Sequence, residues 1–287
     1  MSHETPEPAP SSPAPSSPGQ NRPGHAPDIE IGTLIALAVG NTRSRIGLFK
    51  GTELDGSSVH DAVDAAGIAA AALALSDRAE GDDNPAVVIA TVNPEMTDAI
   101  EAELKKSGLR AMRFGRDLPI PFVHSLDESG EKTVGQDRLM CAAGAFAIVK
   151  QACVVVDLGT AMTVDFVDGE GVFHGGAIAP GLNLMLGSLA EGTSALPSIE
   201  YERPGAIFGK NTPDAMRLGV TAMAQGAVRY LAERYADYYE AYPRIVATGG
   251  DMGLLEDDEL VETFLPDLQL HGIRRACEIL LEEDDEG

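Results

Sequence analysis

Basic side chains are scarce in this chain of 287 residues. Its 21 Lys and Arg residues stand against 45 Asp and Glu residues, for a formal net charge of −24. A surface this acidic repels the phosphates of nucleic acids and of anionic lipids. We therefore expect neither a nucleic acid nor a membrane among the partners of this protein.

Cysteine and long apolar runs are also in short supply. The three cysteines, Cys141, Cys153 and Cys277, are too few and too scattered for a disulfide framework or a zinc cluster, and they are typical of reduced thiols. No apolar run reaches the roughly 20 residues that a membrane span needs. Hydrophobic residues make up 44% of the chain, which is a globular value. These features predict a globular protein of the cytoplasm.

Bulky apolar residues are nearly missing from residues 1–30, where Pro, Ser and Ala dominate. Such a segment cannot bury enough surface to offset the entropy that ordering costs, so we expect a disordered tail. It also lacks the apolar core of a secretory signal peptide. A proline segment that binds a partner remains an alternative for this tail.

The remaining chain contains the same pattern twice. Residues 34–49 form an apolar strand, a glycine turn and a second strand, and residues 152–167 repeat this order. Each hairpin precedes a mixture of strands and helices, which favours an α/β fold. We infer a structural duplication with a boundary near Lys150, giving an N-terminal domain over 31–150 and a C-terminal domain over 151–287.

Periodicity and punctuation predict the other elements. Pro94 and Gly108, for example, are the expected start and stop signals of a helix. The expected helices lie over 61–79, 94–108, 135–150, 213–239 and 271–283, and the further strands over 86–92, 110–115 and 244–250.

Two glycine turns in one chain suggest phosphate binding. Glycine lets backbone N–H groups converge on an anion without a Cβ in the way. Turns that face each other across a cleft can hold a triphosphate from both sides, and a carboxylate such as Asp157, just before the second turn, can hold a metal ion. A single turn favours an ordinary hairpin, whereas the repeat favours the phosphate site.

Seven short motifs follow one another in the order found in one enzyme family. They are Gly40-Asn41-Thr42, Gly135-Gln136-Asp137-Arg138, the segment from Asp157 to Asp165, Gly175 to Leu182, Thr193 to Pro197, Gly209 to Thr212, and Thr248 to Asp251. Over residues 34–281 the chain resembles the type III pantothenate kinases. The resemblance implies an α/β, two-domain actin-like (ribonuclease H-like) duplication with a cleft between the domains. It also implies a homodimer and ATP-dependent phosphorylation of pantothenate to 4′-phosphopantothenate, the first step of coenzyme A biosynthesis.

The resemblance also implies roles for single residues. Asp137 is the expected general base, because a carboxylate can accept the proton of a primary hydroxyl, and the guanidinium of Arg138 suits the carboxylate of pantothenate. Asp157 is the expected site of a monovalent cation, K⁺ or NH4⁺. The other expected substrate-binding residues are Gly135, Gln136 and Thr212. The residues expected to bind ATP with Mg²⁺ are Ala38, Val39, Gly40, Asn41, Thr42, Arg43, Ser44, Arg45, Thr160, Gly249 and Gly250.

Plainer interpretations exist for some of these residues. Asp137 and Arg138 also suit a helix start, where an acidic side chain complements the dipole. Thr212 precedes Pro213 and is typical of a helix N-cap, which is compatible with binding an anion. Gly249 and Gly250 also fit a plain turn between a strand and a helix.

The chain departs from the family pattern at two places. Ala38 replaces the Asp that in the family begins the first motif and helps to hold Mg²⁺ and phosphate, so turnover is expected to be slow. The Tyr that in the family usually precedes the Gly135 motif is missing. His124 could take the place of this Tyr in the substrate pocket; the plainer interpretation is that His124 belongs to a surface loop. Three functions therefore stay open: an active pantothenate kinase, a weak or inactive relative that acts as a nucleotide or acid sensor or as a dimer partner, and another small-molecule kinase of this fold.

Overall fold

The computed structural model describes residues 32–79 and 85–285. The tail predicted over residues 1–30 lies outside the described residues. Within the described part of the chain, no helix is long and apolar enough to cross a membrane.

The first sheet has five strands in the order β3-β2-β1-β4-β5. The first three strands pair antiparallel, and β4 and β5 run parallel to β1. The central strand β1 is apolar because helices cover both of its faces, whereas β3 at the edge is polar and was not predicted. The strands are β1 (Thr33–Val39), β2 (Arg43–Lys50), β3 (Glu53–Asp61), β4 (Val87–Thr91) and β5 (Ala111–Arg113).

The second sheet repeats this topology. Its order is β10-β9-β6-β7-β8, again with an antiparallel meander on one side of the central strand and two parallel strands on the other. The same arrangement in both sheets confirms the predicted α/β duplication of the actin-like, ribonuclease H-like type. The strands are β6 (Cys153–Leu158), β7 (Ala161–Val167), β8 (Phe173–Pro180), β9 (Arg244–Thr248) and β10 (Val261–Phe264).

The five predicted helices lie close to their expected positions, and the structure adds α3 and α5, which were not predicted. The last one begins three residues earlier than expected, at Leu268, and the first is shorter because Asp64 caps it by accepting a hydrogen bond from the N–H of Gly67. The helices are α1 (Ala65–Ser76), α2 (Pro94–Lys106), α3 (Glu128–Thr133), α4 (Gln136–Val149), α5 (Leu182–Gly192), α6 (Thr212–Tyr239) and α7 (Leu268–Asp285), with a 3₁₀ helix η1 (Met252–Leu255).

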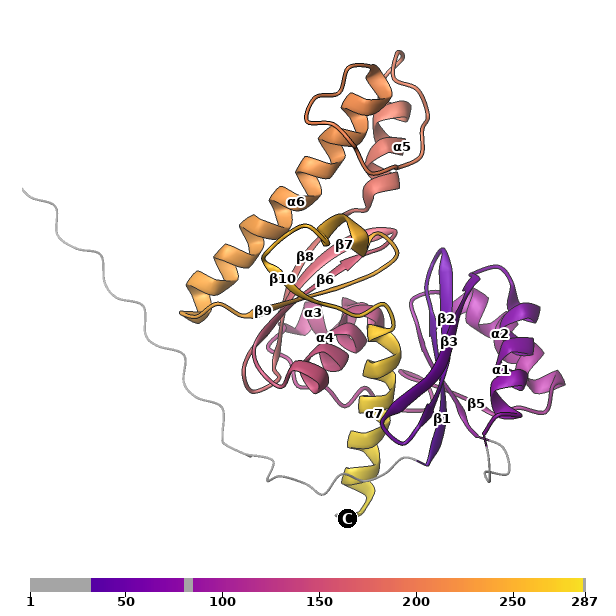
Figure 1. The fold of residues 1–287 in the computed structure, drawn as a ribbon. Coiled ribbons are helices and arrows are strands. Elements are labelled where there is room, and N and C mark those ends of the chain that lie inside the picture. Colours follow the sequence, from indigo (N-terminus) through magenta and orange to yellow (C-terminus); the bar gives the residue numbers. More distant parts are fainter. Residues whose placement is uncertain (1–31, 80–84, 286–287) are drawn as a thin grey trace, which may run out of the picture.

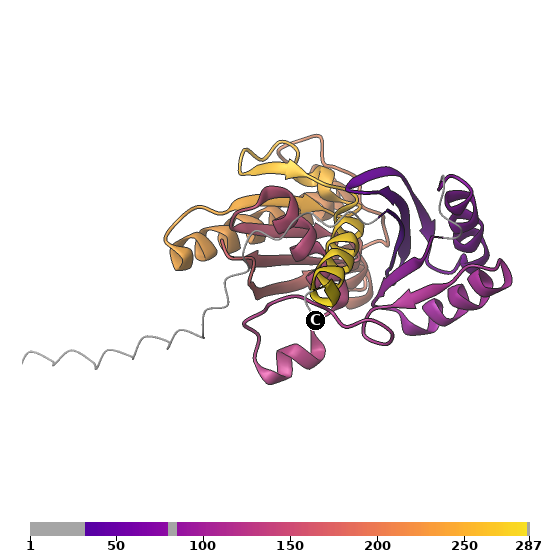
Figure 2. The same cartoon turned by 90° about the horizontal axis from the view of Figure 1, so that it is seen from below.

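The elements stack in layers, and two helices occupy the middle. Helices α1 and α2 cover the outer face of the first sheet, α6 covers the outer face of the second, and α4 and α7 lie between the sheets (Figure 1 and Figure 2). The two middle helices approach closely at glycines. A Cβ on Gly272 would lie 1.9 Å from the carbonyl oxygen of Met140, and one on Gly144 would lie 2.5 Å from that of Leu268.

Lys150 ends α4 in the left-handed conformation, with φ of 50°. The strands of the first sheet precede this residue and those of the second follow it. Helix α7 comes from the second half of the chain, yet it packs against β1 of the first sheet. The boundary between the halves, 31–150 and 151–287, stays a prediction, and α7 joins the two halves in space.

Candidate active site

The two glycine hairpins meet at their turns. The hydroxyl of Thr42 lies 2.8 Å from the hydroxyl of Thr160, so the two expected phosphate-binding threonines are hydrogen-bonded to each other across the halves of the molecule. Arg43 reaches toward the turn after β9, where a Cβ on Gly250 would lie 3.4 Å from Nη1. The predicted convergence of the two turns is thus present within a single chain.

The turn after β9 passes directly over the end of β6. Gly249 has φ of 91°, and a Cβ there would lie 2.4 Å from Oδ1 of Asp157 and from the carbonyl oxygen of Leu158. The N–H of Asp251 donates to that carbonyl oxygen at 2.9 Å. Glycine at this position therefore lets the backbone approach Asp157 closely, and the role of Gly249 and Gly250 in nucleotide binding stays a prediction.

Only some residues of the predicted ATP-binding stretch, 38–45, have side chains that are exposed and free to contact a nucleotide. The side chains of Val39 and Ser44 are buried, so contact of either residue with a nucleotide is limited to the backbone. Arg45 points to the opposite face of β2 from Ser44 and forms an ion pair with Asp267, 2.7 Å away. The exposed side chains of this stretch come from residues 41–43 at the turn.

Asp137 lies in the first turn of α4, where an acidic side chain suits the helix dipole. Its Oδ1 accepts a hydrogen bond from the N–H of Arg138 at 2.8 Å, and Gly135 leaves it room, since a Cβ there would lie 2.3 Å away. Burial raises the pKa of Asp137, and the N–H and charge of Arg138 oppose this increase. A higher pKa makes the carboxylate a better proton acceptor, as a general base requires.

Gln136 fixes the start of α4 to the first sheet. Its side-chain oxygen accepts from the N–H of Thr91 at 3.0 Å, and its side-chain nitrogen donates to the carbonyl oxygen of Phe114 at 3.1 Å. Both ends of the amide are thereby used by the fold. In the structure Gln136 positions its neighbour Asp137.

Asp157 is a half-buried carboxylate with few partners. Sγ of Cys141 lies 3.9 Å from its Oδ2, and the side-chain amide of Gln269 at the start of α7 lowers its pKa. Burial, followed by the negative charges of Asp137 and Asp165, raises the pKa of Asp157 to about 6. A buried carboxylate that lacks a basic partner fits a bound cation, which would restore the ionised form.

Arg138 is a cation among the carboxylates of Asp137, Asp157 and Asp165. Its guanidinium forms a two-pronged ion pair with Asp165 and lies over the ring of Phe173, 5.6 Å from the centroid. With Asp137, Asp157 and Asp165 ionised, the cluster of four side chains carries a net charge of −2. Repulsion of this kind favours a bound cation and disfavours an anionic substrate without one.

The described side chains near these carboxylates do not form a coordination site for a divalent metal. Over residues 32–79 and 85–285, no three His, Cys, Asp or Glu side chains are arranged to hold a metal ion. Ala38 provides only a methyl group at the end of β1. Mg²⁺ keeps several waters in most sites and binds phosphate oxygens well, so the residues fit a magnesium ion that is carried by the nucleotide.

Thr212 does not cap helix α6, and this part of the prediction is wrong. Asn211 is the cap: its side-chain oxygen accepts from the N–H of Asp214 at 2.9 Å, and Thr212 is the first helical residue. The reason is that Asn is the stronger capping residue and that Pro213, which has no N–H, tolerates the second helical position equally well.

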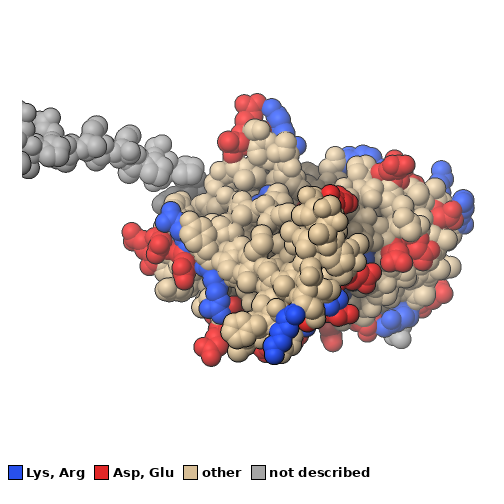
Figure 3. Space-filling model, turned by 90° about the horizontal axis from the view of Figure 1, so that it is seen from above, with Lys and Arg blue, Asp and Glu red and all other residues tan. Residues whose placement is uncertain are grey.

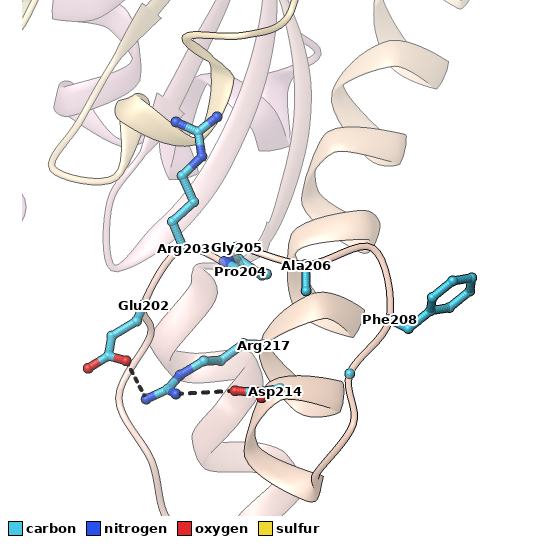
Figure 4. Close-up of a pocket in the computed structure, with 9 residues that line it drawn as sticks. Glu202, Arg203, Pro204, Gly205, Ala206, Phe208, Asp214 and Arg217 are labelled. Atoms are coloured by element: carbon cyan, nitrogen blue, oxygen red, sulfur yellow. Dashed lines mark ion pairs between the residues drawn. The ribbon is translucent and has the colours of Figure 1, made fainter.

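Within one chain Thr212 also lies far from Asp137. Helix α6 begins at the end of the molecule beside α5, away from α4 (Figure 1). Figure 4 shows the preceding loop folded over the first turns of α6, where Arg217 pairs with Glu202 at 3.1 Å and Asp214 at 4.0 Å beside a cavity of about 170 Å³. The structure brings the two hairpin turns, the turn after β9 and the start of α4 into one region, whereas the motifs Thr193 to Pro197 and Gly209 to Thr212 lie at the far ends of α5 and α6.

Other residues of the site have no counterpart in the sequence-based prediction of roles. Asp165 belongs to the second hairpin motif but carried no assigned role, and Cys141 lies one turn after Asp137 on α4. Gln269 gives no signal in the sequence, because only the packing of α7 between the sheets brings it to Asp157. His124 is half-buried in the segment before α3; its backbone pairs with Phe173, and its Nδ1 has no hydrogen-bond partner among the described residues.

Comparisons with known proteins identify the family of this chain. The family model of type III pantothenate kinases matches residues 34–234. The chain belongs to the type III pantothenate kinase family. The type III pantothenate kinase of Dehalococcoides mccartyi is 34% identical over 249 residues, which cover 84% of this chain and 95% of that protein. The type III pantothenate kinase of Rhodopirellula baltica is 37% identical over 206 residues, 64% of this chain and 72% of that protein.

A solved structure supports the fold alone. The crystal structure of a candidate Baf family transcriptional activator from Campylobacter jejuni superposes with a TM-score of 0.51 at 18% sequence identity. The match covers 88% of this chain and all of that one. The type III pantothenate kinase family is thus established by sequence, and the solved structure agrees on how the chain is folded.

Proposed function

We propose that this chain is a phosphotransferase that moves the γ-phosphoryl group of ATP to the primary hydroxyl of pantothenate. The product is 4′-phosphopantothenate, and the reaction is the first step of coenzyme A biosynthesis. Membership of the family makes the chain a kinase that uses ATP with a divalent metal. The observation that carries the proposal is the half-buried carboxylate of Asp137, which lies next to Arg138 and whose charge acts on Asp157, beneath the glycine turn after β9.

Each group has a simple chemical task in this reaction. Asp137 accepts the proton of the substrate hydroxyl as the new P–O bond forms. The hydroxyls of Thr42 and Thr160 and the backbone of the turns hold the phosphates, and Arg138 binds the substrate carboxylate. Mg²⁺ supplies neutralisation of the phosphate charge when it is bound with ATP.

We further propose a monovalent cation, K⁺ or NH4⁺, at Asp157. The cation lowers the net negative charge of the cluster that Asp137, Asp157 and Asp165 form with Arg138. It would lie between the carboxylates and the incoming anions, where repulsion is otherwise largest. We also place the enzyme in the cytoplasm, in keeping with the free cysteines Cys141, Cys153 and Cys277.

The test of this function is a coupled kinase assay with pantothenate, ATP, Mg²⁺ and K⁺. We expect activity that falls when K⁺ is replaced by tetramethylammonium and that falls as pH decreases through about 6, the pKa of Asp157. More K⁺ should move this acidic limit to lower pH, because the cation and the proton compete for one carboxylate. Equal rates with every cation would remove the cation from the proposal, and no phosphorylation under any condition would contradict the function.

Thermal unfolding offers a second readout of the same site. The folded-state pKa of Asp157, about 6, lies above its ordinary value of 3.8, so the folded protein binds this proton more tightly than the unfolded chain. In the absence of K⁺, the charge on this group therefore destabilises the fold fully above pH 6, and the destabilisation decreases as pH falls from about 6 toward 3.8, so it is partly relieved at pH 5. K⁺ should raise Tm at pH 7.5 and have little effect at pH 5.

We propose that the active enzyme is a homodimer in which Thr212 of one copy completes the site of the other. Thr212 is remote from Asp137 in one chain, although the family motif assigns both to the substrate. The end of the molecule that carries α5 and the start of α6 shows a broad face with few charges (Figure 3). Large hydrophobic side chains exposed on and beside these helices are Ile178, Leu184, Leu189, Ile207, Phe208 and Met223.

Mixing two inactive variants tests this shared site. Asp137→Asn and Thr212→Ala homodimers should each be nearly inactive. After co-expression, half of the dimers are mixed, and each mixed dimer has one intact site, so about one quarter of wild-type activity should return in a two-fold symmetric dimer. Co-expression of each variant with itself is the control. Activity that stays at the level of the separate variants, in a protein that is dimeric by light scattering, would contradict the shared site.

A further inference from the structure

The guanidinium of Arg138 is held along one edge and open at its end. Both carboxylate oxygens of Asp165 accept from Nε, at 3.2 and 3.1 Å, and Oδ1 also accepts from Nη2. Nη1 makes no hydrogen bond within the described part of the chain, and the Arg138 side chain is 14% exposed. A guanidinium has five N–H donors in a fixed fork, so this arrangement leaves the end formed by Nη1 and Nη2 free to bind a second carboxylate.

Asp165 itself is held rigidly. It is 1% exposed, and the hydroxyl of Thr163 stabilises its ionised form, which lowers its pKa. Gly176 lies opposite Asp165 in β8, where a Cβ would come within 2.6 Å of Oδ1 and 2.1 Å of the carbonyl oxygen of Val164. Glycine at this position therefore makes the space that the carboxylate occupies, and the ring of Phe173 limits the movement of the guanidinium from one side.

Other carboxylates compete for the same guanidinium. Asp137 is the next residue in the chain, and its charge already acts on Arg138. An ion pair between Arg138 and Asp137 would occupy the lone pairs that must accept the substrate proton, and it would turn the fork away from the substrate. Asp165 prevents this, because a two-pronged ion pair is the stronger geometry and the partner is already in place.

We propose that Asp165 is the positioning residue of the substrate site: by holding one edge of Arg138, it aims the open end at the substrate carboxylate and leaves Asp137 free as the base. Selectivity for a substrate that ends in a carboxylate then depends on Asp165, although Asp165 does not touch the substrate. This inference rests on the proposed function, which supplies the carboxylate that Arg138 binds.

Binding of pantothenate tests the inference without relying on turnover. Its Kd is measured by calorimetry in the presence of a non-hydrolysable ATP analogue, for the wild type, Asp165→Asn, Arg138→Ala and the double variant. Asp165→Asn should weaken binding about 10-fold or more, the range of one charge-assisted contact. In the Arg138→Ala background, the Asp165 substitution should have less than about a twofold further effect, because the two residues act as one unit.

The opposite result is physically possible, which makes the test sharp. Removing one negative charge from the cluster would by itself tighten the binding of an anion. A lower Kd for Asp165→Asn, or an undiminished effect of Asp165→Asn in the absence of Arg138, would overturn the inference. Asp168→Asn is the matched control, since Asp168 lies three residues later and pairs with His174, 2.8 Å away. It should change the Kd of pantothenate by less than about twofold.

Arg138→Lys covers the case in which Asp165→Asn does not fold. Asp165 can still pair with the ammonium group, but a lysine has no second, planar end for a carboxylate. The variant should bind the ATP analogue normally and pantothenate about 10-fold or more weakly. Normal pantothenate binding by this variant would overturn the inference. If the wild type does not bind pantothenate at all, both the proposed function and this inference are contradicted. If the wild type binds pantothenate and the variants bind it equally well, only the role of Asp165 is contradicted.

Discussion

Replacing Asp137 with Asn is expected to lower kcat by about 10² or more, the usual contribution of a positioned general base. The amide has nearly the same shape, and its oxygen can still accept the hydrogen bond from the N–H of Arg138, so the start of α4 should keep its geometry. What the variant loses is the capacity to take a proton. Affinity for ATP should therefore stay at the wild-type value.

The measurement is kcat in the coupled assay together with the Kd of the ATP analogue. Asp127→Asn is a suitable control, because Asp127 lies ten residues upstream and only caps α3, accepting from the N–H of Gly130 at 2.7 Å. It should retain wild-type kcat. A fully active Asp137→Asn enzyme would contradict the assignment of Asp137 as the general base.

The second large effect is expected from Ala38→Asp. Ala38 packs with Met140 of α4 and Leu270 of α7, so its side chain points into the space between the sheets, on the side where Asp137 lies. A carboxylate at this end of β1 would anchor Mg²⁺ or its waters. We expect tighter binding of Mg·ATP and a faster turnover, by about 1–3 kcal/mol in the transition state, or roughly 5- to 150-fold.

The same substitution should cost stability when no metal is present. Ala38 is 3% exposed, so the new carboxylate would be buried, and Arg45, which lies opposite Ala38 in β2, is already paired with Asp267. Tm should therefore fall in the absence of Mg·ATP and recover when it is added. The activity readout is the Mg²⁺ concentration that gives half-maximal rate, which should decrease in the variant.

Ala36→Asp is the matched control for this change. Ala36 packs into the same cluster as Ala38, two residues deeper in β1, and it is fully buried. A carboxylate there is too far from the turn to reach the phosphates, so it should destabilise the fold with no recovery by Mg·ATP. If Ala38→Asp behaves in the same way as Ala36→Asp, the end of β1 does not face the metal and magnesium is held entirely by the nucleotide and water.

Elements with a strong local signal were predictable from the sequence. The strands β1 and β6 are continuous apolar runs because each is the centre of a sheet covered on both faces, and Pro94 marks the start of α2. The edge strands β3 and β8 were missed because exposed residues interrupt their apolar character. Their pairing comes from the neighbouring strand, which a local pattern does not reveal.

The sequence by itself determined the duplicated fold, the family, and the order of the motifs, since all of these follow from local composition and spacing. Tertiary structure decided which residues meet. Asp165 on β7 reaches Arg138 on α4, and Gln269 on α7 lies next to Asp157. Strand β7 comes early in the second half of the chain and α7 comes last, yet both pack against α4. Thr212 belongs to the same set of motifs but lies at the other end of the molecule, because a long, rigid helix carries it there. Contacts between residues so distant in the chain depend on how whole helices and sheets pack, and short-range patterns carry no information about that packing.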